Sequence, residues 1–135
     1  MKFLLFILIV FNISVFSQDF SSSDLIGTWL LVKEDALSIK PPDVKNFSWS
    51  DSLNLSEPIV IFKKDGNYIY RFAGKEEENE FYFENNELTF HSDGFEGWPV
   101  PSNTVYKVLR LDDEYLITLY NEEIFDEYSF YKRLK

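Results

Sequence analysis

The chain of 135 residues contains no cysteine, one histidine and one methionine. Without cysteine it has no disulfide, no thiolate metal ligand, no thiol nucleophile and no attachment point for a lipoprotein acyl group. The single histidine, His91, leaves no set of imidazoles at metal-ligand spacing. We therefore predict a fold held by its hydrophobic core, with no metal and no other cofactor.

Catalytic signatures are missing as well. A Ser-His-Asp triad would have to use His91, and no serine lies in a nucleophile-elbow context. For His91 we expect an ordinary position at a strand end, with a haem or metal role as the alternative. The acidic runs 76–80 and 112–114 lack the EF-hand pattern and are expected to be a solvated loop and a turn. The sequence predicts that the protein is not an enzyme.

Basic residues are outnumbered, because 13 Lys and Arg stand against 23 Asp and Glu, which gives a net charge of −10. Such an acidic protein repels phosphate backbones and anionic lipid surfaces. We expect no nucleic-acid partner and no binding to a membrane surface.

Long hydrophobic runs are confined to the N-terminus. Residues 3–16 are mostly apolar, and Val15 and Ser17 supply small side chains where a signal peptidase cleaves. We predict a signal peptide over residues 1–17 and a mature chain that starts at Gln18, is secreted or periplasmic and has no membrane span. The alternative is a membrane anchor, but a run of roughly 14 residues is shorter than a spanning helix.

The remainder, residues 18–135, is predicted to be one all-β domain. It begins with a short helical turn in "SSSDLIG", capped by Ser23 or Asp24. Eight runs rich in aromatic and β-branched residues then predict eight strands, at 28–33, 58–63, 67–72, 80–83, 87–91, 104–110, 115–120 and 127–133.

The links between these runs alternate in length. Three are tight hairpins with turn-forming residues, at 64–66, 85–86 and 112–114. Four are longer, at 34–57, 73–79, 92–103 and 121–126. Alternate links of an antiparallel meander lie at opposite ends, so we predict an eight-stranded up-and-down antiparallel β-barrel with a closed base and a loop-lined mouth.

Most of the negative charge falls on the four longer links and their flanks. These acidic residues either keep the loops solvated or act as an electrostatic filter that favours neutral and cationic ligands over carboxylates.

Gly27 and Trp29 open the first predicted strand, and Arg133 lies near the end of the last. Closure of the barrel makes these strands neighbours, so we expect the guanidinium to stack on the indole and to cap nearby carbonyl groups. Gly27 allows a tight turn into the strand and leaves room for the ring. The three residues are predicted to close the base of the barrel.

Four segments carry a resemblance to a known family: "LIGTW", "IVIFKKDGNYIYRF", "YFENNELTF" and "YSFYKRLK". In their order they resemble the small bacterial lipocalin-like domain proteins, over essentially all of residues 18–135. The resemblance implies an eight-stranded barrel around a ligand cavity, in a family whose characterised members bind small, mostly apolar molecules. The chain is shorter than the larger lipocalins and lacks their disulfides and a clear helix after the eighth strand.

The candidate ligand-binding residues are aromatic side chains expected to face the barrel interior, with Phe81 beside them: Phe62, Tyr68, Tyr70, Phe72, Phe83, Phe90 and Tyr106. Aromatic walls with a few hydroxyls suit a flat, mostly apolar ligand with one or two hydrogen-bonding groups. Trp49, Phe95 and Trp98 are expected on the mouth loops, where they would gate the cavity.

The same rings either line a cavity or fill the barrel, since eight strands enclose just enough space for side chains. The leading hypothesis is a barrel that binds a small apolar or amphipathic ligand. The alternative is a filled barrel that acts on a protein partner, or in the cell envelope, through its mouth loops.

Overall fold

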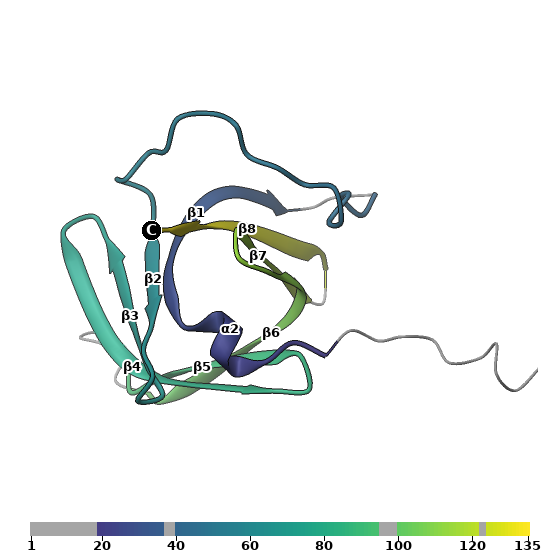
Figure 1. The fold of residues 1–135 in the computed structure, drawn as a ribbon. Coiled ribbons are helices and arrows are strands. Elements are labelled where there is room, and N and C mark those ends of the chain that lie inside the picture. The colour runs from purple at the N-terminus through teal and green to yellow at the C-terminus, as the bar shows by residue number, and fades with distance from the viewer. Residues whose placement is uncertain (1–18, 37–39, 95–99, 122–123) are drawn as a thin grey trace, which may run out of the picture.

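The computed structural model describes residues 19–36, 40–94, 100–121 and 124–135. In this part of the chain eight antiparallel strands form a closed barrel, in which each strand pairs with its neighbours in sequence and β8 pairs with β1 (Figure 1). The predicted fold class, an all-β up-and-down barrel with a short N-terminal helical turn, is confirmed. The predicted signal peptide, residues 1–17, lies outside the described residues.

The strands correspond to the eight predicted runs. They are β1 (Gly27–Ala36), β2 (Ile59–Phe62), β3 (Asn67–Phe72), β4 (Lys75–Glu84), β5 (Glu87–Ser92), β6 (Ser102–Leu111), β7 (Tyr115–Asn121) and β8 (Asp126–Leu134). Within the described ranges, no helix has the length and apolar character needed to cross a membrane.

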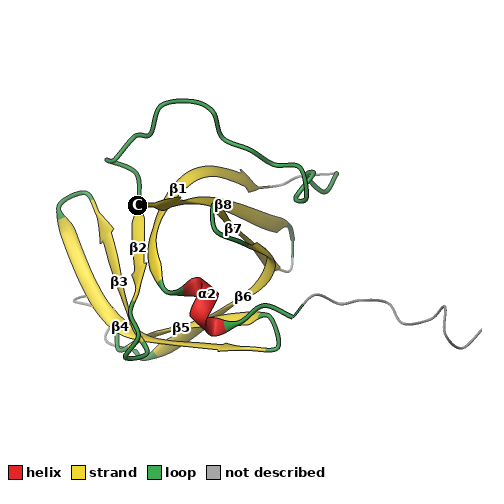
Figure 2. Cartoon of the chain, in the orientation of Figure 1, coloured by secondary structure: helices red, strands yellow, loops and turns green. Residues whose placement is uncertain are grey.

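The helical turn α2 (Ser22–Leu25) precedes β1 and lies within the ring of strands in the view of Figure 2. Its N-cap is Ser21, whose hydroxyl accepts a hydrogen bond from the backbone N–H of Ser23 at 3.3 Å. The expected cap at Ser23 or Asp24 is therefore wrong, because Ser21 is the last residue with extended backbone before the turn.

The three predicted tight hairpins are confirmed, and they lie at the end of the barrel that α2 covers. Asn85 and Asn86 have φ of 53° and 61°, the left-handed conformation that a two-residue hairpin turn requires. The Oδ1 of Asp112 accepts hydrogen bonds from the backbone N–H groups of Glu114 and Tyr115, both at 2.8 Å. This end is the closed base.

The base is closed by Arg133, which pairs with Trp29 across the β1–β8 ladder. The guanidinium lies 4.2 Å from the centre of the Trp29 ring, and its Nη1 and Nη2 donate to the carbonyl groups of Ile26 and Asp24 at 2.9 and 2.5 Å. The indole Nε1 donates to the carbonyl of Leu25 at 2.8 Å. One arginine and one tryptophan therefore tie α2, β1 and β8 together.

The base half of the interior is filled by apolar side chains. A contiguous cluster packs between α2 and the strands and consists of Leu25, Trp29, Val60, Phe62, Tyr68, Phe81, Leu88, Val108, Leu111 and Leu116. Phe62 lies at its centre, with the ring of Phe81 edge-on at 4.9 Å. Among the described residues, the barrel is therefore packed below its middle, and the interior space that could hold a ligand lies toward the mouth.

The first long link, expected at the mouth, instead lies along the outer wall of the barrel. The ring of Phe47 packs against Phe130 at 4.4 Å and against Tyr115 at 5.4 Å. The Nη1 of Arg110 donates to the carbonyl groups of Val44 and Phe47 at 3.1 and 2.8 Å. The expectation failed because β7 and β8 carry apolar residues on their outward faces, and the link buries them.

The second expected long link, residues 73–79, is wrong. β3 and β4 are joined by a two-residue turn, Ala73 and Gly74, with φ of 53° and 76°. β4 then begins at Lys75, and the acidic run that followed as a predicted loop pairs with β3 along its full length. A salt bridge from Arg71 to Glu76 holds this hairpin on its outer face.

Candidate ligand-binding cup at the mouth of the barrel

A partly open cavity of about 210 Å³ occupies the mouth half of the barrel. We call it the mouth cup; its lining residues are Val60, Tyr68, Tyr70, Glu77, Phe90, Ser92, Thr104, Tyr106 and Tyr131. Its volume is below the range of roughly 300–1,000 Å³ that drug-sized ligands occupy. The cup therefore suits a small molecule and not a long lipid chain.

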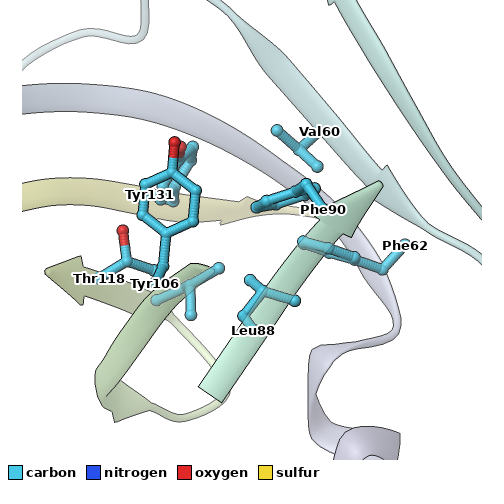
Figure 3. Close-up of a pocket in the computed structure, with 8 residues that line it drawn as sticks. Val60, Phe62, Leu88, Phe90, Tyr106, Thr118 and Tyr131 are labelled. Atoms are coloured by element: carbon cyan, nitrogen blue, oxygen red, sulfur yellow. The ribbon is translucent and has the colours of Figure 1, made fainter. Parts of the chain in front are cut away.

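A small enclosed void of about 10 Å³ lies under the cup (Figure 3). Four residues line both spaces, namely Val60, Phe90, Tyr106 and Tyr131. These side chains form the floor that separates the cup from the void.

Strand register explains how the cup is assembled. Tyr70 lies opposite Val60 on β2 and opposite Glu77 on β4, and Phe90 lies opposite Thr104 on β6. Residues directly opposite in an antiparallel pair point to the same face, so these side chains all face the interior.

Aromatic contacts make the floor continuous. The ring of Phe90 lies edge-on to Tyr68 at 4.7 Å and to Tyr106 at 5.5 Å, and Tyr106 meets Tyr120 at 5.4 Å. The hydroxyl of Tyr68 donates to the backbone carbonyl of His91 at 3.1 Å. The phenol is thereby fixed at the edge of the cup.

The structure brings together four of the seven aromatic residues that the sequence singled out, since Tyr68, Tyr70, Phe90 and Tyr106 line the cup. Phe62 lies below it and lines the void. The other two lie elsewhere: Phe72 is 45% exposed beside the β3–β4 turn, and Phe83 packs against the base core.

Of the three residues expected to gate the mouth, Trp49 lies away from it. The backbone N–H of Trp49 donates to the hydroxyl of Tyr115 at 2.8 Å, and its carbonyl accepts from Lys132 at 3.4 Å. Both partners lie on the base half of the outer wall, so Trp49 cannot cover the cup. Phe95 and Trp98 lie outside the described residues.

Carboxylates that were expected on the loops and their flanks face the interior. Glu77 lines the cup itself, Glu127 lies opposite Tyr120, and Glu34 lies opposite Ser129. Their charges act on the tyrosines, since Glu34 and Glu77 both add to the effect of burial in raising the pKa of Tyr70. The mouth half of the interior is therefore at negative potential.

Two tyrosines deeper in the barrel also have raised pKa values. Burial, followed by the charge of Glu127, raises the pKa of Tyr106 to about 12. Burial also raises the pKa of Tyr131, and the neighbouring Tyr106 adds to this effect. Both phenols stay protonated at neutral pH and present O–H donors beside the cup.

A β-bulge in β1 decides which charge reaches the interior. The register shifts between Leu31, opposite Tyr131, and Lys33, opposite Phe130. Without the extra residue Lys33 would point inward by simple alternation, whereas in the structure its Nζ lies 5.4 Å from the Phe130 ring on the outer wall. The bulge thus places Glu34 inside and a lysine outside.

Thr118 lines the void and carries a buried side-chain hydroxyl. It is 2% exposed, and its Oγ1 has no hydrogen-bond partner among the described residues. An unsatisfied buried hydroxyl costs about 1–3 kcal/mol. The void is mostly apolar and has about the volume that a single water occupies.

No protein-family model matches the chain. No curated protein matches it either. The eight-stranded barrel is consistent with a lipocalin-like fold, and a fold of this kind does not by itself determine function.

The structure places His91 on β5 near the mouth, where both ring nitrogens have partners. Nδ1 lies 2.7 Å from Oδ1 of Asn103, and Nε2 lies 2.8 Å from Oδ1 of Asp93. These contacts, Asn103 first, raise the pKa of His91 above its ordinary value of 6.5. Among the described residues, no three potential metal-ligating side chains of His, Asp or Glu come together.

The raised pKa of His91 predicts a pH dependence. A raised folded-state pKa means that the imidazolium contacts stabilise the fold fully below about pH 6.5, and that this contribution is lost as pH rises through the folded-state pKa. NMR titration of the single histidine is expected to give a midpoint above 6.5, and Asn103→Ala should lower it. A midpoint at or below 6.5 in the unmodified protein would contradict the assignment.

Proposed function

We propose that the protein is a secreted or periplasmic lipocalin-like barrel that binds a small amphipathic molecule in the mouth cup, and that it acts as a binding protein and not as an enzyme. The observation that carries the proposal is the cup itself: a concave space with aromatic walls and a few polar groups, at the open end of a barrel that is packed below. Such spaces are where small molecules bind in proteins.

The chemistry of the lining supports an amphipathic ligand. Val60 and Phe90 supply apolar surface, while Ser92, Thr104 and the tyrosine hydroxyls supply hydrogen-bonding groups. Apolar contact provides affinity, and the hydroxyls orient the ligand.

The first test is native mass spectrometry of the mature chain purified from its own source, compared with its denatured mass. A discrete excess that disappears on denaturation would support the proposal and give the mass of the ligand. The same sample reports the N-terminus, which the proposed leader cleavage places at Gln18. No excess, together with no uptake of an apolar fluorescent probe, would instead favour a barrel that acts on a protein partner through its mouth loops.

A tryptophan substitution separates the cup from the outer wall. Thr104 lines the cup, and the next residue of β6, Val105, is 46% exposed on the opposite face. Thr104→Trp fills the cup and is expected to weaken probe uptake roughly tenfold or more, whereas Val105→Trp adds the same ring outside and should leave uptake unchanged. Fluorescence titration measures probe uptake by both variants, and equal effects of the two substitutions would contradict the assignment of the cup as the binding site.

A further inference from the structure

We infer that the ligand of the mouth cup is a small organic ammonium ion: a short primary amine with an apolar or aromatic body, its charged end between Glu34 and Glu77 and its body on Phe90. This inference rests on the proposed function and narrows the class of molecule. It follows from which charges face the interior, from the aromatic floor and from an orphaned hydroxyl beneath it.

The inward-facing ionisable groups of the mouth half are predominantly acidic. Glu77 on β4 lines the cup, while Glu34 on β1 and Glu127 on β8 face the same interior without being part of its lining. Among the described residues, neither Glu34 nor Glu77 forms a salt bridge. Lys75 shares the face of Glu77 but lies exposed at the β3–β4 turn.

The outward-facing carboxylates of the same hairpin behave differently. Glu78 pairs with Lys63, and Glu76 pairs with Arg71 at 3.0 Å. The charges of these two solvent-facing glutamates are thus balanced by basic side chains. Glu77, one position away from each, faces an aromatic cavity and has no salt-bridge partner within the described ranges. A cation supplied by a ligand would complete this arrangement.

The tyrosines fit the same cation. Tyr70 and Tyr106 line the cup together with Glu77, and the negative face of an aromatic ring attracts an ammonium group. Burial, and after it the charge of neighbouring carboxylates, raises the pKa of both phenols, and the same carboxylates favour the protonated form of a bound amine. A carboxylate ligand would be repelled by the same groups.

A second, independent observation is the buried hydroxyl of Thr118. Its Oγ1 has no partner among the described residues and faces the void under the floor, which shares Tyr106 and Tyr131 with the cup (Figure 3). A ligand that carries a hydroxyl opposite its ammonium group would give Thr118 a hydrogen bond once the floor side chains move aside. The cup thus offers an acidic group for one end of the ligand, and Thr118, beneath the floor, offers a hydroxyl for the other end.

The test compares probes of one shape and three charges by isothermal titration calorimetry: phenethylamine, 2-phenylethanol and phenylacetate. Phenethylamine is expected to bind about tenfold more tightly than the alcohol, and phenylacetate not at all. Raising the ionic strength should weaken binding of the amine and leave binding of the alcohol unchanged.

Two variants locate the charge. Glu77→Gln and Glu34→Gln should each lower the affinity for phenethylamine several-fold and change the affinity for 2-phenylethanol by less than twofold. Glu78→Gln, on the same strand but the outer face, is the matched control with the same change in net charge and should leave both affinities unchanged. Circular dichroism and thermal unfolding confirm that each variant folds.

A third variant tests the contact expected at the end of the ligand opposite its ammonium group. Tyramine adds a hydroxyl to phenethylamine, and Thr118→Val removes the protein hydroxyl at nearly constant volume. The variant should bind tyramine several-fold more weakly and phenethylamine with unchanged affinity. If both proteins bind tyramine equally well, Thr118 does not contact the ligand.

The outcomes separate the inference from the proposed function. Binding of the alcohol or the acid as tightly as the amine would overturn the inference and leave a ligand-binding barrel in place. Amine binding that Glu77→Gln and Glu34→Gln leave unchanged would also overturn it. If none of the three probes and no apolar fluorescent dye binds, the proposed function itself fails.

Discussion

Replacing Trp29 with alanine is expected to lower the free energy of unfolding by about 3–5 kcal/mol, the range for deleting a large aromatic side chain from a core. Trp29 is fully buried and touches the base core on one side and Arg133 on the other. Its loss would leave a cavity, free the carbonyl of Leu25 and remove the stacking partner of a partly buried guanidinium. Urea unfolding followed by circular dichroism measures the change.

Such a loss is a large share of the roughly 5–15 kcal/mol that holds a typical domain folded, so a graded series is needed. Trp29→Phe keeps an aromatic ring but removes the indole N–H, and it should cost less than the alanine variant. The control is Tyr82→Ala, which removes a ring that is 55% exposed on the outer wall and should cost less than about 1 kcal/mol. A cost for Trp29→Ala as small as that of the control would contradict the role of Trp29 in closing the base of the barrel.

Gly27→Ala is expected to cost about 1–3 kcal/mol, although it adds a single methyl group. Gly27 has φ of 142°, which L-residues rarely adopt, and an added Cβ would lie 2.6 Å from Nη1 of Arg133. That nitrogen cannot simply move away, because it donates to the carbonyl of Ile26 while the guanidinium lies over Trp29. Backbone strain and a steric clash therefore act together.

A double-mutant cycle with Arg133→Ala separates the two causes. If the clash contributes, Gly27→Ala will cost less in the Arg133→Ala background than in the native protein, by more than the roughly 0.5 kcal/mol error of additivity. We expect this coupling. Equal costs in both backgrounds would assign the whole effect to the backbone conformation and contradict the predicted clash.

The sequence was informative wherever local chemistry determined the structure. Asn85 and Asn86 tolerate positive φ, and Gly66 supplies it, so the base turns were predictable. The contact between Trp29 and Arg133 was predictable too, because the two residues lie at the two ends of a sheet that closes on itself. Strand order followed because tight links force neighbouring strands to pair.

The mouth was harder to predict for physical reasons. Ala73 takes positive φ without being glycine or asparagine, and glutamate is uncommon in strands, so residues 73–79 of the β3–β4 hairpin looked like a loop. The first long link was expected over the cup because its length gave no sign that Phe47 would be buried against Phe130. Chain length alone does not say which face of a barrel a link covers.

From the sequence, the carboxylates of the mouth half were not assigned to the interior. The pattern of β8 could have assigned one of them, whereas a bulge in β1 hid another. Glu127, Ser129 and Tyr131 alternate along β8, a period of two that could have assigned all three to the interior. Glu34 offered no such signal, because the bulge between Leu31 and Lys33 exchanges the faces of β1 within a single residue. A bulge of this kind depends on pairing with a distant strand and leaves little trace in local sequence.

The β3–β4 hairpin has a further consequence for how the protein behaves in a concentrated solution. β4 pairs with β5 only through Phe81 to Glu84, and within the described part of the chain Lys75 to Glu80 pairs with β3 alone, which leaves an open strand edge. Open edges invite strands of other molecules and so promote aggregation, and charged side chains oppose this. Four of these six residues are glutamates, so two copies of the edge repel each other. The acidic run thus protects the barrel from self-association at the place where its sheet is least complete.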